Sequence, residues 1–447
     1  MRLFHLNWHR RQYMASDKPT PDVDEKPLSS NHLDLLENLD STVKNIISKV
    51  TGSGFSIWIV GGAVRDSLSK IPIQDIDLAS NATPSQLMEI FPSSIPTGIQ
   101  FGTVTIPSAG DFGDIEITTL RKDGTYLDRR RPETVRFGTS LSDDLNRRDF
   151  KINAMAIDPI KLLFYDPHGG QKDLESGILS AVGEASQRLE EDGLRIMRAY
   201  RFMCHNSGPF TPDQNLSQAL INSVEFLNSI SRERIWMEFS TLLSYQSVSK
   251  VLQRMVDDGV MNYVIPGCND VSGVDNCNFE GISDHNLVIG RLSLLLKSFD
   301  EESVTKILKE LLVSNKIRNS VISITKRIGI IPNTESNGCL RRYRIELGED
   351  LIPQMSAERG HSVEESDKLR TALSLLPALS GGNEPLVSGT EILSRLGIEP
   401  GPLLGEIKQW LFRIQVEYDI SDSDSVWDKA NSLGFIDKPL GEHRMWV

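Results

Sequence analysis

Cysteine is scarce in this chain, and its four copies stand far apart. No CxxC pair occurs among Cys204, Cys268, Cys277 and Cys339. This spacing argues against a zinc-binding motif or a disulfide framework, and it predicts a protein of a reducing compartment. Long apolar runs are also missing, since none approaches the roughly 18 residues that a membrane-spanning helix needs. We therefore expect a protein that does not enter a membrane.

Basic charge is in deficit as well. The 48 Lys and Arg residues stand against 61 Asp and Glu residues, so the net charge is −13. This balance argues against a protein that coats nucleic acid with its whole surface, but it allows a local basic groove. Residues 121–151 hold nine basic and six acidic residues, whereas residues 206–447 hold 24 and 33. A polyanion should therefore meet the chain near residues 121–151 and on the helix that follows.

The N-terminal residues give an ambiguous signal for the location of the protein in the cell. Residues 1–16 contain three Arg and no acidic residue, but for a transit peptide the stretch is short and poor in Ser. The predicted location is the cytoplasm, and organelle targeting is the alternative. Residues 17–30 are rich in Pro and acidic side chains. We predict that residues 1–30 form a disordered lead-in.

With 447 residues, of which 39% are hydrophobic and 24% charged, the chain has the composition of a globular protein of two to four domains. Alternating apolar residues and short apolar runs predict strands over 55–60, 74–78, 101–106 and 114–120. A capping box at Thr83 and Gln86 predicts a helix over 83–91. From residue 184 onward the apolar residues follow the helical period instead. This order predicts an α+β domain over 31–178 and an all-α second half.

Two carboxylates lie two residues apart on one predicted strand. Asp75 and Asp77 should project to the same side, because side chains alternate along a strand. Oxygen ligands placed side by side suit Mg²⁺, and two such ions about 3.5–4 Å apart can drive an in-line phosphoryl displacement. Glu116, between the core residues Ile115 and Ile117, is either a third carboxylate directed at the metal or an ordinary solvent-facing residue.

The segments around these carboxylates could hold a nucleotide. Gly61 and Gly62 end an apolar strand and allow close approach of a triphosphate to the backbone, and Arg65 adds charge. The alternative is a plain turn followed by a surface arginine. Arg148 and Asp149 could bind a phosphate and a ribose. Their alternative is a helix C-terminus with favourable cations.

A charged series on the next predicted helix offers a way to read a base. The helix is predicted to run unbroken from about Glu184 to Phe202, which places Asp192 and Arg195 side by side. Adenine and cytosine each present an amine donor beside a ring-nitrogen acceptor. A carboxylate next to an arginine would therefore accept A and C and reject G and U. The alternative is a chain of surface salt bridges.

Together these segments resemble the class II tRNA nucleotidyltransferases, which comprise the CCA-adding enzymes and the bacterial poly(A) polymerases. The resemblance rests on Gly61-Gly62-Ala-Val-Arg65-Asp66, Asp75-Ile-Asp77, Arg147-Arg148-Asp149-Phe-Lys-Ile-Asn-Ala-Met-Ala156 and Glu191-Asp192-Gly-Leu-Arg195. It implies a nucleotidyltransferase head of the DNA polymerase beta type over 31–178. A helical neck with the base-reading helix would follow over 179–267, and a helical body and tail that bind tRNA over 268–447.

The resemblance also implies roles for single residues and a set of partners. Asp75 and Asp77 would be the Mg²⁺ ligands and catalytic carboxylates, with Glu116 as the candidate third. Nucleotide binding would fall to Gly61, Gly62, Arg65, Arg148, Asp149, Asp192, Arg195, Arg198 and Arg201. The expected partners are tRNA, ATP and CTP, with no obligate protein partner evident.

Relatives with other activities share much of this pattern. Poly(A) polymerases of bacteria usually end in a basic tail, which the net charge of −9 over residues 206–447 disfavours. Enzymes that add only C look shortened where this chain keeps a polar loop with five Arg over residues 121–136. An enzyme that adds only A remains an alternative. A catalytically silent RNA-binding module would have no reason to keep both Asp75 and Asp77 with the Asp192 and Arg195 pair.

Overall fold

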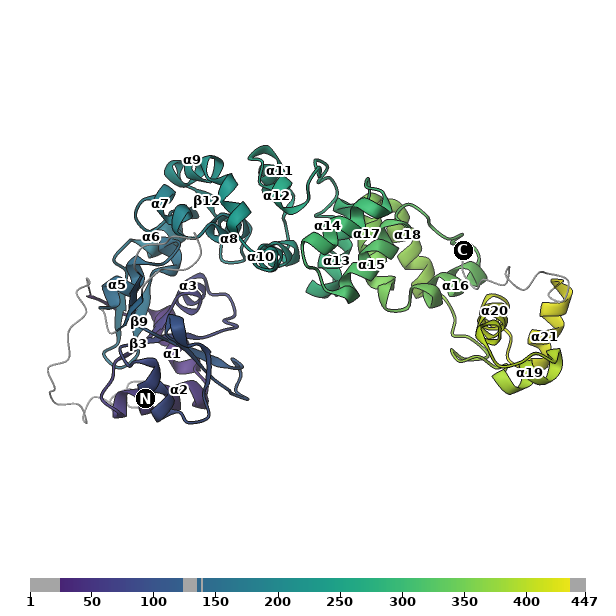
Figure 1. The fold of residues 1–447 in the computed structure, drawn as a ribbon, viewed down its shortest axis with the longest axis horizontal. Coiled ribbons are helices and arrows are strands. Elements are labelled where there is room, and N and C mark those ends of the chain that lie inside the picture. Colours follow the sequence, from purple (N-terminus) through teal and green to yellow (C-terminus); the bar gives the residue numbers. More distant parts are fainter. Residues whose placement is uncertain (1–24, 124–134, 138–139, 435–447) are drawn as a thin grey trace. The chain divides into compact units, whose positions relative to one another are not determined.

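The computed structural model describes residues 25–123, 135–137 and 140–434. The chain divides into two compact units, residues 1–269 and residues 270–447 (Figure 1). Among the described residues, no helix has the length and apolar character needed to cross a membrane.

The first unit is built on an eight-stranded mixed sheet. Its strand order is β1-β10-β9-β2-β3-β6-β5-β4. The strands are β1 (Glu25–Pro27), β2 (Ile57–Val60), β3 (Asp77–Ser80), β4 (Ile95–Gly98), β5 (Thr103–Ile106), β6 (Ile115–Thr119), β9 (Ala156–Asp158) and β10 (Leu163–Tyr165). β3 and β6 pair in parallel, whereas the neighbouring pairs β2–β3 and β5–β6 are antiparallel.

Alternation along the central strands decides which side chains enter the core. Ile57, Ile59, Leu78 and Ile117 point to one face, where α1 (Ser30–Asn38), α2 (Ser41–Gly52) and α4 (Pro84–Ile90) cover them. The opposite face carries Trp58, Val60 and Ala79, which pack on α5 (Leu141–Asn146). Because successive strand residues face opposite ways, Asp77 and Glu116 lie away from the main core. The sheet thus leaves both carboxylates on the face opposite its main core.

Local sequence signals set the ends of the helices near the site. Thr83 and Gln86 form the predicted capping box at the start of α4, and Ser140 caps α5 by accepting from Asp143 N–H. The helix α3 (Gly62–Ser69) follows β2 directly. The helix predicted over 83–91 is confirmed, as are the strands predicted over 55–60, 74–78, 101–106 and 114–120, with shifts of up to three residues at the ends.

Two segments differ from expectation or lie partly outside the described residues. Glu25–Pro27, within the predicted lead-in, forms β1 and pairs with β10. An edge strand of three residues is held by its backbone partner, so it leaves little trace in side-chain pattern. In the loop predicted over 121–136, β7 (Arg121–Asp123) pairs with β8 (Val135–Phe137), and the residues between them lie outside the described part.

The remainder of the first unit is helical apart from a short parallel pair, β11 (Ile178–Leu179) with β12 (Thr211–Pro212). Its helices are α6 (Gly170–Ser176), α7 (Ala185–Glu191), α8 (Leu194–Met203), α9 (Gln214–Asn222), α10 (Arg232–Ser244), α11 (Ser249–Asp257) and α12 (Met261–Val264). The prediction of one unbroken helix over 184–202 is wrong, because the chain leaves the helical path at Asp192. A Cβ at Gly193 would lie 2.9 Å from the Phe226 carbonyl oxygen, so close contact with that segment accompanies the break.

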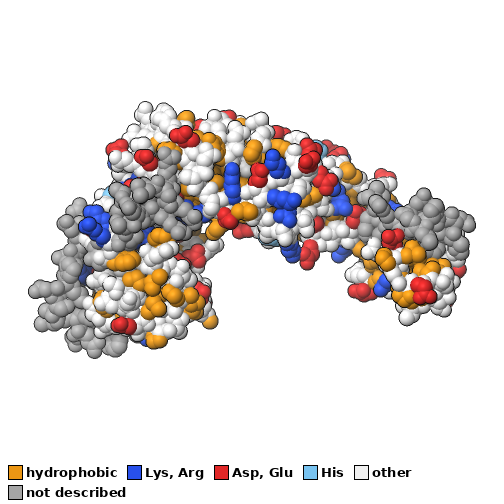
Figure 2. Space-filling view, viewed as in Figure 1, with side chains coloured by type: hydrophobic (Ala, Val, Ile, Leu, Met, Phe, Trp, Pro, Cys, Tyr) orange, Lys and Arg blue, Asp and Glu red, His pale blue; other side chains and the backbone are white. Residues whose placement is uncertain are grey.

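The second unit is all-α over its described residues. Its helices are α13 (Asp284–Leu295), α14 (Glu301–Glu310), α15 (Asn315–Thr325), α16 (Asn337–Leu347), α17 (Leu351–His361), α18 (Val363–Ser374), α19 (Gly389–Leu396), α20 (Pro402–Tyr418) and α21 (Ser423–Ser432). Figure 2 shows basic and acidic side chains interspersed on the face of this unit that it presents. Some charged side chains of the unit pair, as Arg327 does with Glu346 at 2.6 Å.

Candidate active site

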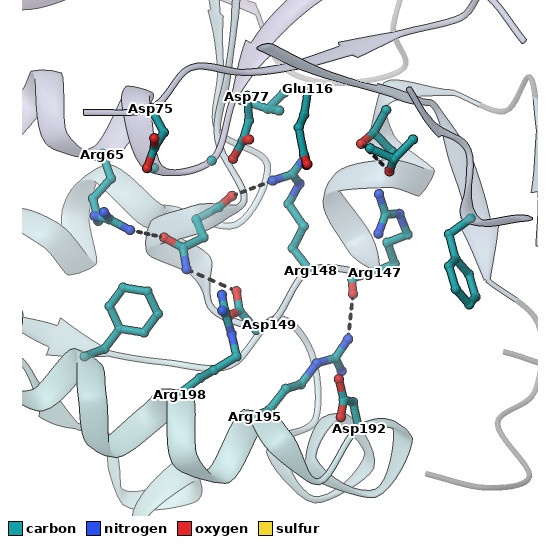
Figure 3. A pocket seen from close by; sticks show the side chains of 18 of the residues that line it. Arg65, Asp75, Asp77, Glu116, Arg147, Arg148, Asp149, Asp192, Arg195 and Arg198 are labelled. Carbon is teal, nitrogen blue, oxygen red and sulfur yellow. Dashed lines mark hydrogen bonds and ion pairs between the residues drawn. The ribbon is translucent and has the colours of Figure 1, made fainter. Parts of the chain in front are cut away.

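A polar pocket of about 870 Å³ lies in the first unit, beside the sheet. All twelve residues that the sequence nominated line it, and Figure 3 shows most of them. The lining combines carboxylates from the sheet with arginines from α3, α8 and the segment after α5. Such a combination suits an anionic ligand held beside a cation.

The carboxylates come from two neighbouring strands and the loop before one of them. Asp77 begins β3 and stands in register with Glu116 of β6. Asp75 precedes the strand, which corrects the prediction that both aspartates lie within it. Asp77 pairs with Val60, the last residue of β2, so Asp75 has no partner strand there. Figure 3 shows the three carboxylates directed into the same space.

Crowding changes the proton affinity of these carboxylates. Withdrawal from water in the pocket raises the pKa of Asp77, Arg148 opposes the rise, and Asp75 adds to it. The pKa of Glu116 is raised by the same withdrawal and by the charges of Asp77 and Asp75. A cation at this point would relieve the repulsion, and the donors are all oxygens. The residues present therefore fit Mg²⁺.

Within the described part of the chain, no group of three or more His, Cys, Asp and Glu side chains is arranged as a metal cage. An ion held by Asp75 and Asp77 would complete its coordination with other oxygens. Mg²⁺ is usually bound in this way, through one or two carboxylates together with substrate phosphates.

The Gly61–Gly62 turn provides space beside the carboxylates. Gly61 has a φ of +72°, which favours glycine. A Cβ there would lie 3.1 Å from Arg148 Nη1 and 3.6 Å from Asp77 Oδ2. The turn therefore brings backbone close to both groups, and the first N–H groups of α3 follow it. This arrangement is suitable for phosphate oxygens.

Arg65 is buried and fixed by several partners. Its Nε donates to Asp66 Oδ1 at 2.8 Å, and its Nη1 donates to Asn153 Oδ1 at 2.6 Å. Asn153 in turn donates to Asp149 Oδ1 at 3.2 Å. The interpretation of Arg65 as an ordinary surface residue is therefore wrong, and its guanidinium is held in place at the pocket wall.

Arg147 and Arg148 share a buried anchor. Both bond to Asp144, at 2.6 Å from Arg147 Nη2 and 3.1 Å from Arg148 Nη2. Burial alone would raise the pKa of Asp144, but the two guanidiniums outweigh it and lower the pKa. The alternative of cations near a helix C-terminus is thus partly correct, since Arg147 caps α5. Arg148 nevertheless reaches the pocket beside Gly61.

Asp149 links the sheet domain to α8. Its Oδ2 accepts from Arg198 Nη2 at 2.6 Å, and its Oδ1 accepts from Phe150 N–H at 2.7 Å. Burial acts to raise the pKa of Asp149, but Arg198 and the N–H donors lower it overall. Arg198 and Arg201 both contact Glu238 of α10. A ribose contact by Asp149 would have to share these oxygens.

The side chains of Asp192 and Arg195 do not pair with each other. Asp192 Oδ2 accepts from Arg234 Nη2 at 2.9 Å. Arg195 donates to Glu191 Oε2, and its Nη2 donates to the Arg147 carbonyl oxygen at 2.9 Å. Both residues still line the pocket, where Figure 3 shows them close together. The alternative of a chain of salt bridges is therefore partly correct, since Asp192 and Arg195 each belong to an ion pair, but with Arg234 and Glu191 rather than with each other.

Comparison with known proteins agrees with this geometry. Residues 57–180 match the family described as the Poly A polymerase head domain, and residues 209–271 match the family described as the probable RNA and SrmB- binding site of polymerase A. The CCA-adding enzyme of Ligilactobacillus salivarius is 32% identical over 411 residues, which cover 89% of this chain and 98% of that protein. The CCA-adding enzyme of Leuconostoc mesenteroides is 31% identical over 386 residues, 85% of this chain and 93% of that protein. The chain belongs to the CCA-adding enzyme family.

Solved structures of CCA-adding enzymes share its fold. The Bacillus stearothermophilus enzyme in complex with CTP is 26% identical and superposes with a TM-score of 0.70, covering 92% of this chain and all of that one. The Thermotoga maritima enzyme complexed with tRNA is 20% identical, with a TM-score of 0.63 over 92% and 99% of the two chains. A nucleotidyltransferase head followed by helical parts, as predicted, is therefore confirmed.

Four further residues at the site of this CCA-adding enzyme family member were given no role from the sequence. Asn153 and Glu238 each join two arginine or carboxylate groups, and Arg234 holds Asp192. Phe202 lies beneath three arginines, with Arg201 centred 4.6 Å from its ring. A helical spacing of four places Arg234 and Glu238 on one side of α10, which was the available signal.

His205 makes the stability of the folded protein depend on pH. Burial, then Arg65 and Arg201, lower the pKa of His205 to about 3, and Tyr245 packs edge-on against the ring. The unfolded chain takes up the proton near pH 6.5, so stability is lost as the pH falls below that value. At pH 5.5 this one group should cost about 1.4 kcal/mol. In His205→Gln, the loss of unfolding free energy between pH 7.5 and 5.5, measured with urea, should be smaller by about that amount. An equal loss in both proteins would contradict the assignment.

Proposed function

We propose that this chain adds C, C and A to the 3′ end of tRNA, using CTP and ATP without a nucleic-acid template. The observation that carries the proposal is the pocket itself. It is lined by Asp75 and Asp77 together with the Gly61–Gly62 turn, and also by Asp192 and Arg195. Membership of the CCA-adding enzyme family supports the same activity.

The proposed roles follow the geometry. Gly61, Gly62 and Arg65 hold the triphosphate, Arg148 faces it from across the turn, and Asp192 with Arg195 contacts the base. Asp75 and Asp77 would hold Mg²⁺, which when bound orients the triphosphate and neutralises charge on it. Arg198 and Arg201, fixed by Asp149 and Glu238, complete the wall.

The reaction joins the terminal 3′ oxygen of the RNA to the α-phosphorus. The bond from that phosphorus to the bridging oxygen of the β-phosphate breaks, pyrophosphate leaves, and the proton of the hydroxyl passes to water. Fixed charges around the pocket stabilise the transition state without rearranging. Arg65 and Arg148 are held in advance by Asn153 and Asp144, so they meet this requirement.

The order in which bases are accepted tests the proposal. Purified protein is incubated with tRNA that lacks its last three nucleotides, in the presence of CTP, ATP or both, and the product ends are sequenced. We expect two C residues with CTP alone and CCA with both nucleotides. Addition of A only to tRNA that already ends in CC would favour the A-only alternative. Long A tails would favour a poly(A) polymerase.

A further inference from the structure

The pocket continues past the carboxylates to a wall that has no role so far. Phe101, Thr103, Thr118 and Arg121 line this part, which we name the Phe101 wall. Phe101 ends the 3₁₀ turn η2 (Ile99–Phe101), and only Gly102 separates it from β5. Thr103 of β5 stands in register with Thr118 of β6, and their hydroxyl oxygens lie 3.1 Å apart.

The order of strands places this wall on one side of the carboxylates. Across the sheet, the neighbours run β2, β3, β6, β5. The Gly61–Gly62 turn follows β2, Asp77 begins β3, Glu116 lies on β6 and Thr103 begins β5. The glycine turn and the Phe101 wall are therefore on opposite sides of Asp77. Figure 3 likewise shows Arg65 on one side of Asp77 and Glu116 on the other.

The geometry of an in-line displacement, combined with this strand order, predicts the side from which the RNA end approaches. The attacking oxygen and the leaving oxygen lie on opposite sides of the reacting phosphorus. If pyrophosphate leaves toward the glycine turn, as the proposed function requires, the 3′ hydroxyl approaches from the side of β6 and β5. We propose that the Phe101 wall is the subsite for the last nucleotide of the RNA strand, and that Phe101 stacks on its base.

The chemistry of the wall suits that ligand. Arg121 donates to the Phe101 carbonyl oxygen, and its guanidinium lies 5.8 Å from the centre of the Phe101 ring. Phe101 is thereby anchored, and Arg121 adds a charge that suits a phosphate. An aromatic ring accepts any base, which is required because the last base of the strand changes at each addition. The Thr103 and Thr118 hydroxyls can both donate and accept, as contact with a ribose 2′-hydroxyl demands.

The test removes the ring and the base separately. Wild-type protein, Phe101→Ala and Phe101→Trp are assayed for CTP addition to a tRNA minihelix that ends in C. A second minihelix carries a 3′-terminal ribose without a base. Loss of a stacked base should lower kcat/KM by about 5- to 150-fold, so Phe101→Ala should lose that factor on the normal RNA. On the baseless RNA the alanine variant and the wild type should agree, and Phe101→Trp should keep wild-type activity on the normal RNA.

Other outcomes would overturn the proposal. Equal losses for Phe101→Ala on both RNAs would mean that the ring only supports the pocket. A raised KM for CTP with an unchanged KM for RNA would place the ring on the nucleotide side. Ile99 is an exposed residue of the same turn and does not line the pocket. The control variant Ile99→Ala should therefore keep the wild-type kcat/KM on both RNAs. If the wild type extends neither RNA, the proposed function itself fails and the subsite fails with it.

Discussion

Replacing Asp77 with asparagine should lower the rate of nucleotide addition by at least about 10³-fold. Loss of one fixed electrostatic group at a reacting centre typically costs 10²–10³-fold, and loss of a metal ligand should cost more. Asparagine keeps the shape of the side chain, and Asp77 lies on the face away from the core, so folding should be preserved. Turnover at saturating Mg²⁺ and CTP measures the effect, with thermal unfolding as a check on the fold.

Asp75→Asn should lose activity in the same way, although Asp75 lies before the strand rather than in it. Asp34→Asn is a matched control, because Asp34 is an exposed residue of α1 outside the pocket. Binding of tRNA, followed by filter retention, should be nearly unchanged in all three variants. Near-normal turnover of either Asp75→Asn or Asp77→Asn would refute the assignment of these carboxylates as metal ligands.

Loss of the Asp192 carboxylate should weaken the choice of base. Asp192 can accept from the exocyclic amine of A or C, while Arg234 and the Leu194 N–H hold its position. An unpaired polar edge typically costs about 1–3 kcal/mol, so Asp192→Ala should reduce discrimination against UTP and GTP by roughly tens-fold. The measurement is kcat/KM for all four nucleoside triphosphates. Glu190→Ala, an exposed change on the preceding helix, serves as the control.

Arg195→Ala should instead lower kcat/KM for both CTP and ATP. The hydrogen bonds of its side chain to Glu191, the Arg188 carbonyl and the Arg147 carbonyl use three of its five N–H groups, which leaves donors for a ring nitrogen. Unchanged ratios among the four nucleotides in Asp192→Ala would mean that this segment only supports the pocket.

The sequence predicted the side to which the strand carboxylates point, and it predicted the helix starts, because those features are local. Alternation around Glu116 and the capping box at Thr83 depend on residues within a few positions of each other. The break at Asp192 was missed although Asp192-Gly193 is a local turn signal. Apolar spacing continued through it, whereas the close contact of Gly193 with Phe226 is visible only in three dimensions.

The same distinction separates the correct and incorrect parts of the site. Every nominated residue lines the pocket, since each motif was recognised as a unit. The partner of Asp192 could not be predicted, because Arg234 is brought to it by the packing of α10. An i, i+3 spacing indicated Arg195 instead. The sequence pattern thus predicted which residues line the pocket, whereas tertiary packing determines which of them form hydrogen bonds with each other.

The parallel pairing of β3 with β6 has a consequence for how the protein acquires activity. Asp77 and Glu116 become neighbours only after the chain between them has crossed over through α4, β4 and β5. Contacts between residues far apart in sequence require the loss of loop entropy before they contribute any favourable energy, so they form late. The antiparallel pair of β2 and β3, which α3 connects, can form earlier, and of these two residues it contains Asp77 alone. During synthesis, a nascent chain that ends before β6 would therefore carry the glycine turn but not the complete carboxylate edge, and the onset of catalysis would report that the sheet is complete.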